Sequence, residues 1–355
     1  MWSKFRSYLM SKKFIAALLI LFALSLFISC GKAKNDEYGC FQTIDQALKN
    51  AQKNNQEVLV IVTMQGDDDL SQSFVSDILS TKEFKNEILP SYSVMLMDFS
   101  QSSYKKTVVN ETDSKAAKKA AEEYAKIVQN NSKTASLLNV SKTPSLYLLT
   151  KENYFITEVP YTDQVKTFED FKKNLDAQSP LVSQMKEFIA AIQKGSKQEK
   201  LAAIDNLYEN TEIIYRVFLA DLIDKYVEMD KDNESGLLSK YLFAQADAKA
   251  SNLYMSGDLL GATKSYVDIC SNPNLEADYK QQAYYMAAYI MSMSGSSDYA
   301  TILDYLNLSI KANPESESVD SINQVIEYLK SMISQMEAEK QDLDSSSLDT
   351  TIGVE

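Results

Sequence analysis

Two kinds of hydrophobic pattern divide this chain. In the first half, short apolar runs stand between polar stretches, the clearest being residues 58–62, Val-Leu-Val-Ile-Val. A run of this length, bounded by polar residues, predicts a buried strand of a parallel or mixed sheet. In the second half, apolar residues recur at helical spacing and no strand pattern is visible. The patterns therefore predict an α/β domain followed by an all-α domain.

The first half alternates strands with helices. Strands are predicted at residues 58–62 and 91–99, after Pro144 as far as Leu149, and at residues 153–159. Helices are predicted at residues 44–54, with Thr43 as the N-cap, and at 71–79, 114–128 and 167–175.

The second half consists of successive amphipathic helices with short polar breaks between them. They cover residues 181–192, 201–208, 213–227, 237–255, 260–269, 279–293, 299–312 and 319–336. Residues 337–355 are polar and rich in Ser and Asp, which predicts a disordered tail.

The loop after the first strand resembles the active-site loop of the thioredoxin-like family. That family places Cys-x-x-Cys between a buried strand and a helix. The match of Phe74 and residues 78–84 sets the register, so the two cysteine positions fall on Asp68 and Ser71. Residues 137–149 resemble the segment that carries the family's cis-proline, and we expect the Thr143–Pro144 bond to be cis.

This resemblance covers residues 38–178 and implies a central mixed sheet flanked by helices. It also implies that a groove lies beside Thr143 and Pro144. Because neither redox cysteine is present, the family's thiol–disulfide reaction is excluded at this loop. A groove that has lost its cysteines can still accept the main chain of an extended peptide.

Part of the second half, residues 179–336, resembles tetratricopeptide repeats. The positions that match are Ala250, Leu253, Tyr254, Gly257, Asp258, Leu259, Ala262, Tyr266 and Pro273, and more weakly Ala287, Gly295, Asp298, Tyr299, Leu306 and Pro314. The two prolines are 41 residues apart, which is longer than the family's usual repeat. The resemblance implies stacked helical hairpins with a concave surface. Tyr284, Tyr285 and Tyr289 could line that surface for a protein partner, or could pack between helices.

Residues 1–29 have the features of a signal peptide. A basic start is followed by an apolar run over residues 14–28, which is short for a membrane span. The sequence Ser-Cys-Gly at its end resembles a bacterial lipobox. The resemblance implies that Cys30 is lipid-modified and becomes the mature N-terminus, with residues 30–37 as a tether. An uncleaved anchor helix or an ordinary cleaved signal are the alternatives.

Charge and composition exclude several function classes. The chain has a formal charge of −13, and removing the four basic residues of positions 1–29 leaves 32 basic against 49 acidic residues, or −17. Such a chain is repelled by phosphate backbones, so we expect no nucleic-acid partner. The chain contains no histidine, which is the commonest general base and metal ligand. We expect no cofactor and no resident metal.

Three groups could still carry chemistry. Asp67, Asp68 and Asp69 could bind a divalent cation through oxygen atoms, but capping of the following helix explains these residues without a metal. Residues 230–236 faintly resemble an EF-hand loop, although the twelfth position is Tyr241 instead of Glu, so we expect an interhelical loop. Ser71 would need a base that no motif supplies. We therefore expect the protein not to be an enzyme.

These features favour a lipid-anchored, extracytoplasmic protein of a bacterial cell envelope. It would act as a redox-inactive scaffold that binds an unidentified envelope protein or peptide. One alternative is a thiol-redox accessory protein that uses Cys40 or Cys270. Another is a structural envelope lipoprotein that assembles with itself.

Overall fold

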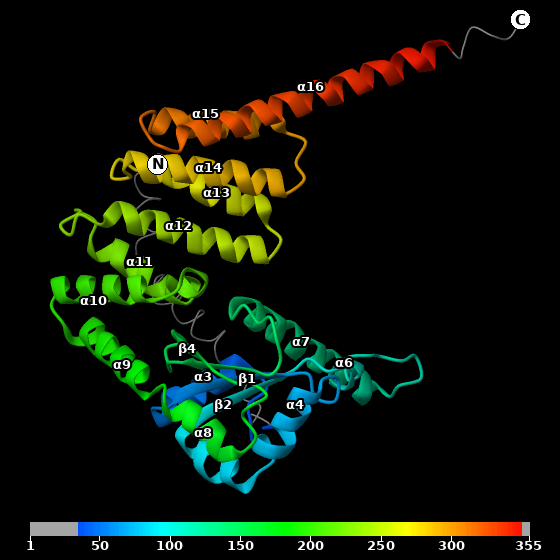
Figure 1. The fold of residues 1–355 in the computed structure, drawn as a ribbon, viewed down its shortest axis with the longest axis vertical. Helices are drawn as coiled ribbons and strands as arrows, with labels where there is room; N and C mark the ends of the chain where they lie inside the picture. Colours follow the sequence, from blue (N-terminus) through cyan, green and yellow to red (C-terminus); the bar gives the residue numbers. More distant parts are fainter. Residues whose placement is uncertain (1–34, 350–355) are drawn as a thin grey trace, which may run out of the picture. The chain divides into compact units, whose positions relative to one another are not determined.

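The computed structural model describes the backbone of residues 35–349 and the side chains of residues 35–338. The predicted signal peptide and the predicted lipidation at Cys30 lie outside these residues. The chain divides into two compact units, and each is described by itself (Figure 1). The first unit extends to Ala177, and the second begins at Gln178 and also takes in the short segments 137–139 and 154–156.

The first unit is built on a four-stranded mixed sheet. The strands are β1 (Glu57–Thr63), β2 (Tyr92–Asp98), β3 (Ser145–Leu149) and β4 (Phe155–Val159), in the order β2-β1-β3-β4. β1 pairs in parallel with β2 and antiparallel with β3. Six of the seven residues of β1 are buried, which explains why its sequence is apolar without alternation.

Helices and single turns complete this unit. They are α3 (Ile44–Asn54), α4 (Asp69–Phe74), α5 (Leu89–Ser91), α6 (Gln101–Lys105), α7 (Lys115–Leu137), α8 (Phe168–Asp176) and two π-helical turns, η1 (Val75–Leu79) and η2 (Phe84–Ile88).

Two of these helices differ from the sequence prediction. The helix expected at 71–79 is α4, followed directly by the π-helical turn η1. α7 continues to Leu137, nine residues past its predicted end at 128. Residues 129–137 contain no Gly or Pro to stop a helix, and the chain turns only at Asn139, which has a φ of 51°.

An aromatic cluster connects α4 with α8 and the turns between them. The ring of Phe74 meets Tyr161 edge-on with centroids 5.1 Å apart, and it meets Phe171 at 5.9 Å. Phe84 lies 6.3 Å from Phe171. All four side chains are buried. This packing holds the end of α4, at Phe74, against α8.

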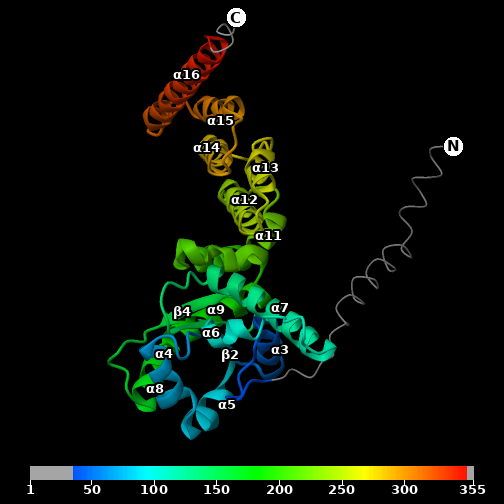
Figure 2. The same ribbon diagram turned by 90° about the vertical axis from the view of Figure 1, so that its right-hand side faces the viewer.

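The second unit is helical from Gln178 onward, and no strand occurs in that part of the described chain. Its elements are α9 (Ser179–Lys194), α10 (Lys197–Asn210), the 3₁₀ turn η3 (Ile213–Leu219), α11 (Ala220–Met229), α12 (Leu238–Met255), α13 (Leu259–Ile269), α14 (Ala277–Met293), α15 (Tyr299–Ala312) and α16 (Val319–Asp349). The helix expected at 213–227 is thus split into η3 and α11. Helices α12 to α16 each pack against the next along the chain (Figure 2).

Small residues let these helices approach closely. Ala246 and Ala250 on α12, Ala262 on α13, and Ala283 and Ala287 on α14 are all buried in one core cluster. The turns α12–α13 and α14–α15 are built alike. Each contains a glycine with positive φ, followed by an aspartate that caps the next helix through its side chain.

The predicted disordered tail is wrong for most of its length. We expected disorder from residue 337, but α16 continues to Asp349. Glu, Lys, Gln, Leu and Ala are good helix formers, and neither Gly nor Pro interrupts the sequence before Gly353. None of the described helices has a stretch long and apolar enough to cross a membrane.

Truncating the centre of β1 should destabilise the first unit strongly. Ile61 is fully buried, so Ile61→Ala should lower the free energy of unfolding by about 2–5 kcal/mol through lost burial and a residual cavity. Urea denaturation followed by circular dichroism measures this change. Val109→Ala, at a side chain that is 45% exposed, is the matched control and should change stability by less than about 0.5 kcal/mol.

Candidate functional site: a groove at the ends of strands β1 and β2

Asp68 occupies the N-cap of α4. Its backbone is extended, and its Oδ1 accepts a hydrogen bond of 2.7 Å from the backbone N–H of Ser71. Asp is among the best residues at this position because it satisfies a donor that the helix leaves free. The residue at the first predicted cysteine position therefore has a structural role in starting the helix.

The structure brings Asp68 together with the second predicted site segment. The hydroxyl of Thr143 donates to Asp68 Oδ2 at 2.8 Å, across 75 residues of sequence. The Thr143–Pro144 bond is cis, which confirms the prediction. Pro144 is buried and Thr143 is half-buried, so the groove is open at Thr143 and not at the proline ring.

Ser71, at the second cysteine position, is not available for chemistry. Its side chain is fully buried, and its Oγ accepts a hydrogen bond of 3.0 Å from the backbone N–H of Met64. This bond ties the end of β1 to the first turn of α4. The alternative role of Ser71 as a nucleophile finds no accessible hydroxyl in this geometry.

The hydrogen bonds at Asp68 favour its charged form. Partial burial raises the pKa of this carboxyl group, but the hydrogen bonds from Ser71 and Thr143 outweigh the burial. The pKa of Asp68 is therefore lowered from its ordinary value of 3.8. At neutral pH the loop between β1 and α4 therefore carries a carboxylate at position 68.

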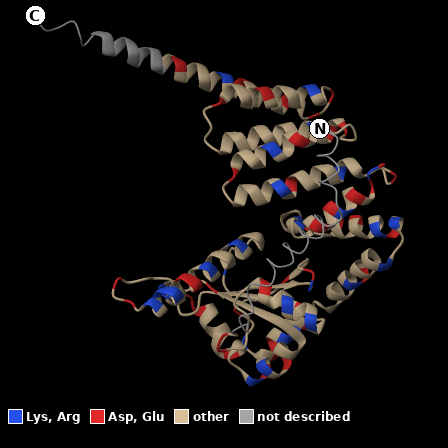
Figure 3. Ribbon diagram, turned by 180° about the vertical axis from the view of Figure 1, so that it is seen from behind, with Lys and Arg blue, Asp and Glu red and all other residues tan. Residues whose placement is uncertain are grey.

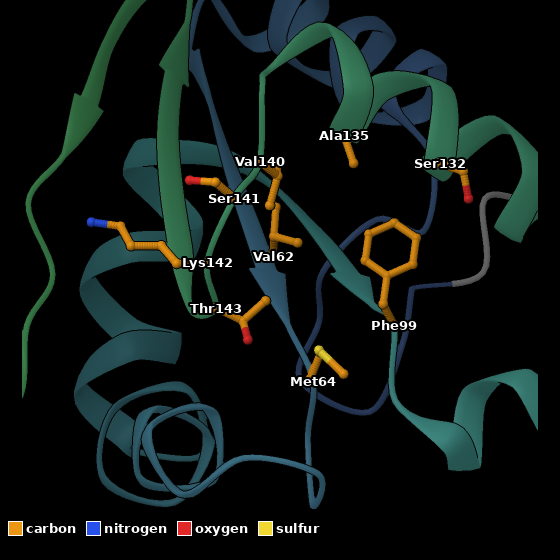
Figure 4. Close-up of a pocket in the computed structure, with 9 residues that line it drawn as sticks. All are labelled: Val62, Met64, Phe99, Ser132, Ala135, Val140, Ser141, Lys142 and Thr143. Atoms are coloured by element: carbon orange, nitrogen blue, oxygen red, sulfur yellow. The ribbon is translucent and has the colours of Figure 1, made fainter.

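An apolar cavity of about 460 Å³ lies beside Thr143, in the size range of ligand-binding pockets (Figure 4). It is lined by Val62, Met64, Phe99, Ser132, Ala135, Val140, Ser141, Lys142 and Thr143. Figure 4 shows the side chains of Met64, Phe99 and Val140 turned toward one space, whereas the amino group of Lys142 points away from it. We call this cavity and its rim the groove.

Of the residues that line the groove, the sequence predicts Thr143 as a site residue. It does not predict Phe99 or Ala135. Ala135 lies on the part of α7 that was expected to be loop, and Phe99 follows directly after β2. The end of a parallel strand is where α/β folds place ligands, so the position of Phe99 was the signal available in the sequence.

The carboxylates of Asp67 and Asp68 already accept hydrogen bonds from the protein. Asp67 Oδ2 accepts from the backbone N–H of Gln101 at 2.6 Å, and both oxygens of Asp68 are bonded as described. Within the part of the chain that the structure describes, no three His, Cys, Asp or Glu side chains are grouped to hold a metal ion. The capping alternative accounts for the geometry of Asp68.

The segment 230–236 is an interhelical loop between α11 and α12, as predicted. Asp230 is fully buried, and it accepts hydrogen bonds from the backbone N–H and the hydroxyl of Ser235. Asn233 Oδ1 accepts from the N–H of Leu238. These side chains close the loop with their own backbone and do not converge on a cation.

Both cysteines of the described residues are free and buried. Burial raises the pKa of Cys40 well above its ordinary value of 9.0, and the charge of Asp36 adds to the effect. Burial raises the pKa of Cys270 to about 11. A thiol that is buried and protonated at neutral pH is a poor nucleophile. Neither environment favours the alternative of a thiol-redox role.

The three tyrosines singled out on α14 behave differently. Tyr284 is half-buried and packs against the core cluster of α12–α14, so it is a packing residue. Tyr285 is 36% exposed and Tyr289 is 50% exposed. Met293, four residues further on, is 57% exposed. Residues four apart share one helix face, so these three side chains form an exposed apolar stripe, which we call the α14 stripe.

Few charges interrupt the helices around this stripe. α14 carries only Asp278 and Lys280 in 17 residues. Figure 3 shows the same scarcity of Lys, Arg, Asp and Glu along α12 and α13. Depletion of charge together with exposed Tyr and Met is typical of the centre of protein–protein interfaces.

The C-terminal part of the chain is similar to a family of uncharacterised proteins. Residues 237–335 match a family described as "Uncharacterised protein C-terminal domain". An uncharacterized protein of Treponema pallidum (strain Nichols) is 28% identical over 131 residues, which is 37% of this chain and 44% of that protein. The match thus spans less than half the length of this relative. No solved structure matches the chain.

Removing the Asp68 carboxyl should destabilise the first unit. Asp68→Ala should cost about 0.5–2 kcal/mol, because both the helix cap and the bond to Thr143 are lost. Asp68→Asn, which can still cap, is the matched control and should cost less. Urea midpoints of the wild-type chain and both variants measure these differences.

The difference in stability between the natural chain and Asp68→Asn should depend on pH. The pKa of Asp68 is lowered in the folded state, so the stability due to its charge is fully present above the unfolded-state pKa. It is lost as pH falls through the folded-state value, which lies below 3.8. Urea midpoints from pH 7 to pH 2 should therefore converge for the two proteins at the acidic end.

The two buried thiols should resist labelling. In the full chain with Cys30→Ser, a thiol reagent at pH 7.5 should modify less than about one tenth of Cys40 and Cys270 in the time that labels an exposed cysteine fully. Unfolding the chain in concentrated guanidinium should then expose both. Rapid labelling of either thiol in the folded protein would contradict this and revive the thiol-redox alternative.

Proposed function

We propose that this protein is a lipid-anchored, non-catalytic scaffold of a bacterial cell envelope that binds another protein through its helical unit. The observation that carries the proposal is the α14 stripe. Isolated exposed apolar residues are ordinary, but three on one helix face with few charges around them match the composition of an interface core. Tyr makes such contacts at a low cost in side-chain ordering, and the flexible side chain of Met adapts to its partner.

The helical hairpins support a repeat-like architecture for this unit. α12–α13 and α14–α15 each turn through a glycine and an aspartate cap, and each pair packs on the next. A hairpin of this kind cannot bury its apolar face alone, and stacking leaves an extended surface for a partner. The tetratricopeptide-like character of the unit is part of the proposal.

The thioredoxin-like character of the first unit is also proposed. Its support is the sheet order β2-β1-β3-β4, the cis Thr143–Pro144 bond, and a helix that is capped by Asp68. In this proposal the groove is a second docking surface, which receives an extended peptide beside Thr143. The site has lost the two cysteines and keeps the groove.

The membrane attachment in the proposal depends on the sequence of residues 1–30. A basic start, an apolar run and Ser-Cys-Gly support lipidation of Cys30, with the remaining chain outside the cytoplasm. More than one acyl chain on this cysteine would give stable anchoring without a membrane-spanning helix.

Truncating the α14 stripe should weaken partner binding without unfolding the protein. In-cell crosslinking of the anchored protein, followed by mass spectrometry, identifies what lies against α14. Tyr285→Ala combined with Tyr289→Ala should lower the yield of heterologous crosslinks about tenfold, whereas stability should change by less than about 1 kcal/mol.

Tyr104→Ala, at a tyrosine of the first unit that is 47% exposed, is the matched control and should leave these crosslinks unchanged. Crosslinks that form only between copies of the protein would replace the scaffold with the self-assembling alternative. Unchanged crosslinks in the double variant would show that the α14 stripe is not the binding surface.

A further inference from the structure

A second pocket of the first unit lies at the ends of its two parallel strands. Gln65 follows shortly after β1, Asp98 is the last residue of β2, and both line this pocket together with Asn131 of α7. The carboxyl ends of parallel strands are where α/β folds place ligands. The volume of about 100 Å³ is well below that of pockets for drug-sized molecules, so it suits a small chemical group. We call this space the Asn131 pocket.

Asn131 supplies a hydrogen-bond acceptor that has no donor. Its side chain is only 7% exposed, and its Nδ2 donates to the carbonyl oxygen of Gln42, another lining residue, at 3.1 Å. Its Oδ1 is buried and accepts no hydrogen bond from any described residue. Buried amide oxygens in folded proteins are nearly always bonded, so this atom indicates a donor that a ligand would bring.

The charged groups on the wall of the pocket are predominantly negative. They are the carboxylates of Asp36, Glu37 and Asp98 and the ammonium group of Lys106. In the described part of the chain, none of these carboxylates forms an ion pair. The amino group of Lys106 lies over the ring of Tyr124 instead, 5.5 Å from its centroid. The pocket therefore favours a cation that donates hydrogen bonds.

The arrangement of the acceptors favours an organic cation over a metal ion. Among the described residues, no three His, Cys, Asp or Glu side chains are grouped to hold a metal. A guanidinium group has five N–H donors in one plane and stacks on aromatic rings, so it can reach acceptors that stand apart. Tyr38 and Tyr124 both line the pocket, and the hydroxyl of Tyr38 is held by Gln65 Nε2 at 3.3 Å.

We infer that the Asn131 pocket binds a guanidinium group, the head group of an arginine side chain. Oδ1 of Asn131 accepts one of its N–H groups, and the carboxylates of Asp36 and Glu37 offset its charge. Phe99 lines both this pocket and the groove, but the inference does not depend on docking in the groove.

Isothermal titration calorimetry with the full chain in detergent tests this assignment. The probe is N-acetyl-arginine methylamide, which should bind with a Kd below about 1 mM. Its matched control is the citrulline analogue, which has nearly the same shape and no charge, and which should bind at least about tenfold more weakly. Raising the salt from about 50 mM to about 500 mM should weaken binding of the arginine compound only.

Propylguanidine separates two sources of the guanidinium group. It carries the same head group without the peptide atoms. Binding as tight as that of the arginine compound would assign the pocket to free guanidinium compounds. Clearly weaker binding would assign it to arginine within a peptide chain.

Variants of the lining residues test the geometry. Glu37 is exposed, so Glu37→Gln should weaken binding about threefold and leave stability unchanged. Lys106→Met should strengthen binding about threefold, because it removes the positive charge beside the ligand. Asn131→Leu should abolish binding. Glu83→Gln, at an exposed acid elsewhere in the first unit, is the matched control.

Three results would overturn the inference. Equal binding of the arginine and citrulline compounds would exclude selection for the charged group. Weaker binding by Lys106→Met would show that the pocket prefers an anion. Failure of the arginine compound to bind at about 10 mM would remove the site itself. None of these results bears on the α14 stripe, which the crosslinking experiment tests separately.

Discussion

Strand β1 is the constraint on which the first unit depends. Both of its edges are paired, in parallel with β2 and antiparallel with β3, and six of its seven residues are buried. A strand in this position has no free backbone groups and no face open to water, so helices must cover the sheet. After β1 the chain continues through a short loop into α4. The groove lies where that loop meets the segment before β3.

The junction between these two segments joins the helix start to the strand ends through hydrogen bonds. Asp68 and Ser71 each hold the start of α4, Asp68 as its cap and Ser71 through its bond to the end of β1. Thr143 is joined to the same carboxylate. Asp68 and Ser71 therefore hold the helix in place, and neither offers a thiol or a free nucleophile. Beside this junction lies the apolar cavity that Thr143 lines.

The helical unit follows a different physical principle. Its helices contribute alanines to the shared core and keep several large side chains outside. Close helix packing through small residues leaves less apolar area to bury per helix, so stability comes from each helix packing on the next. The exposed Tyr285 and Tyr289 are not needed for that packing, whereas Tyr284 is part of it. Tyr284 and Tyr285 differ because they lie on different sides of α14.

The sequence by itself determined the two kinds of architecture, the four strands and most of the helices. It could do so because periodicity, caps and strong punctuation by Gly, Asn and Pro act over a few residues. The cis Thr143–Pro144 bond was expected from a family resemblance instead, and the short elements η2, α5 and α6 were not predicted. The sequence misjudged the ends of α7 and α16, where no local signal stops a helix and neighbouring contacts or simple propensity decide. Only the tertiary structure joined Asp68 to Thr143, separated Tyr284 from Tyr285, and placed Phe99 and Ala135 around one space. Those relations depend on packing between segments far apart in the chain, which no local pattern encodes.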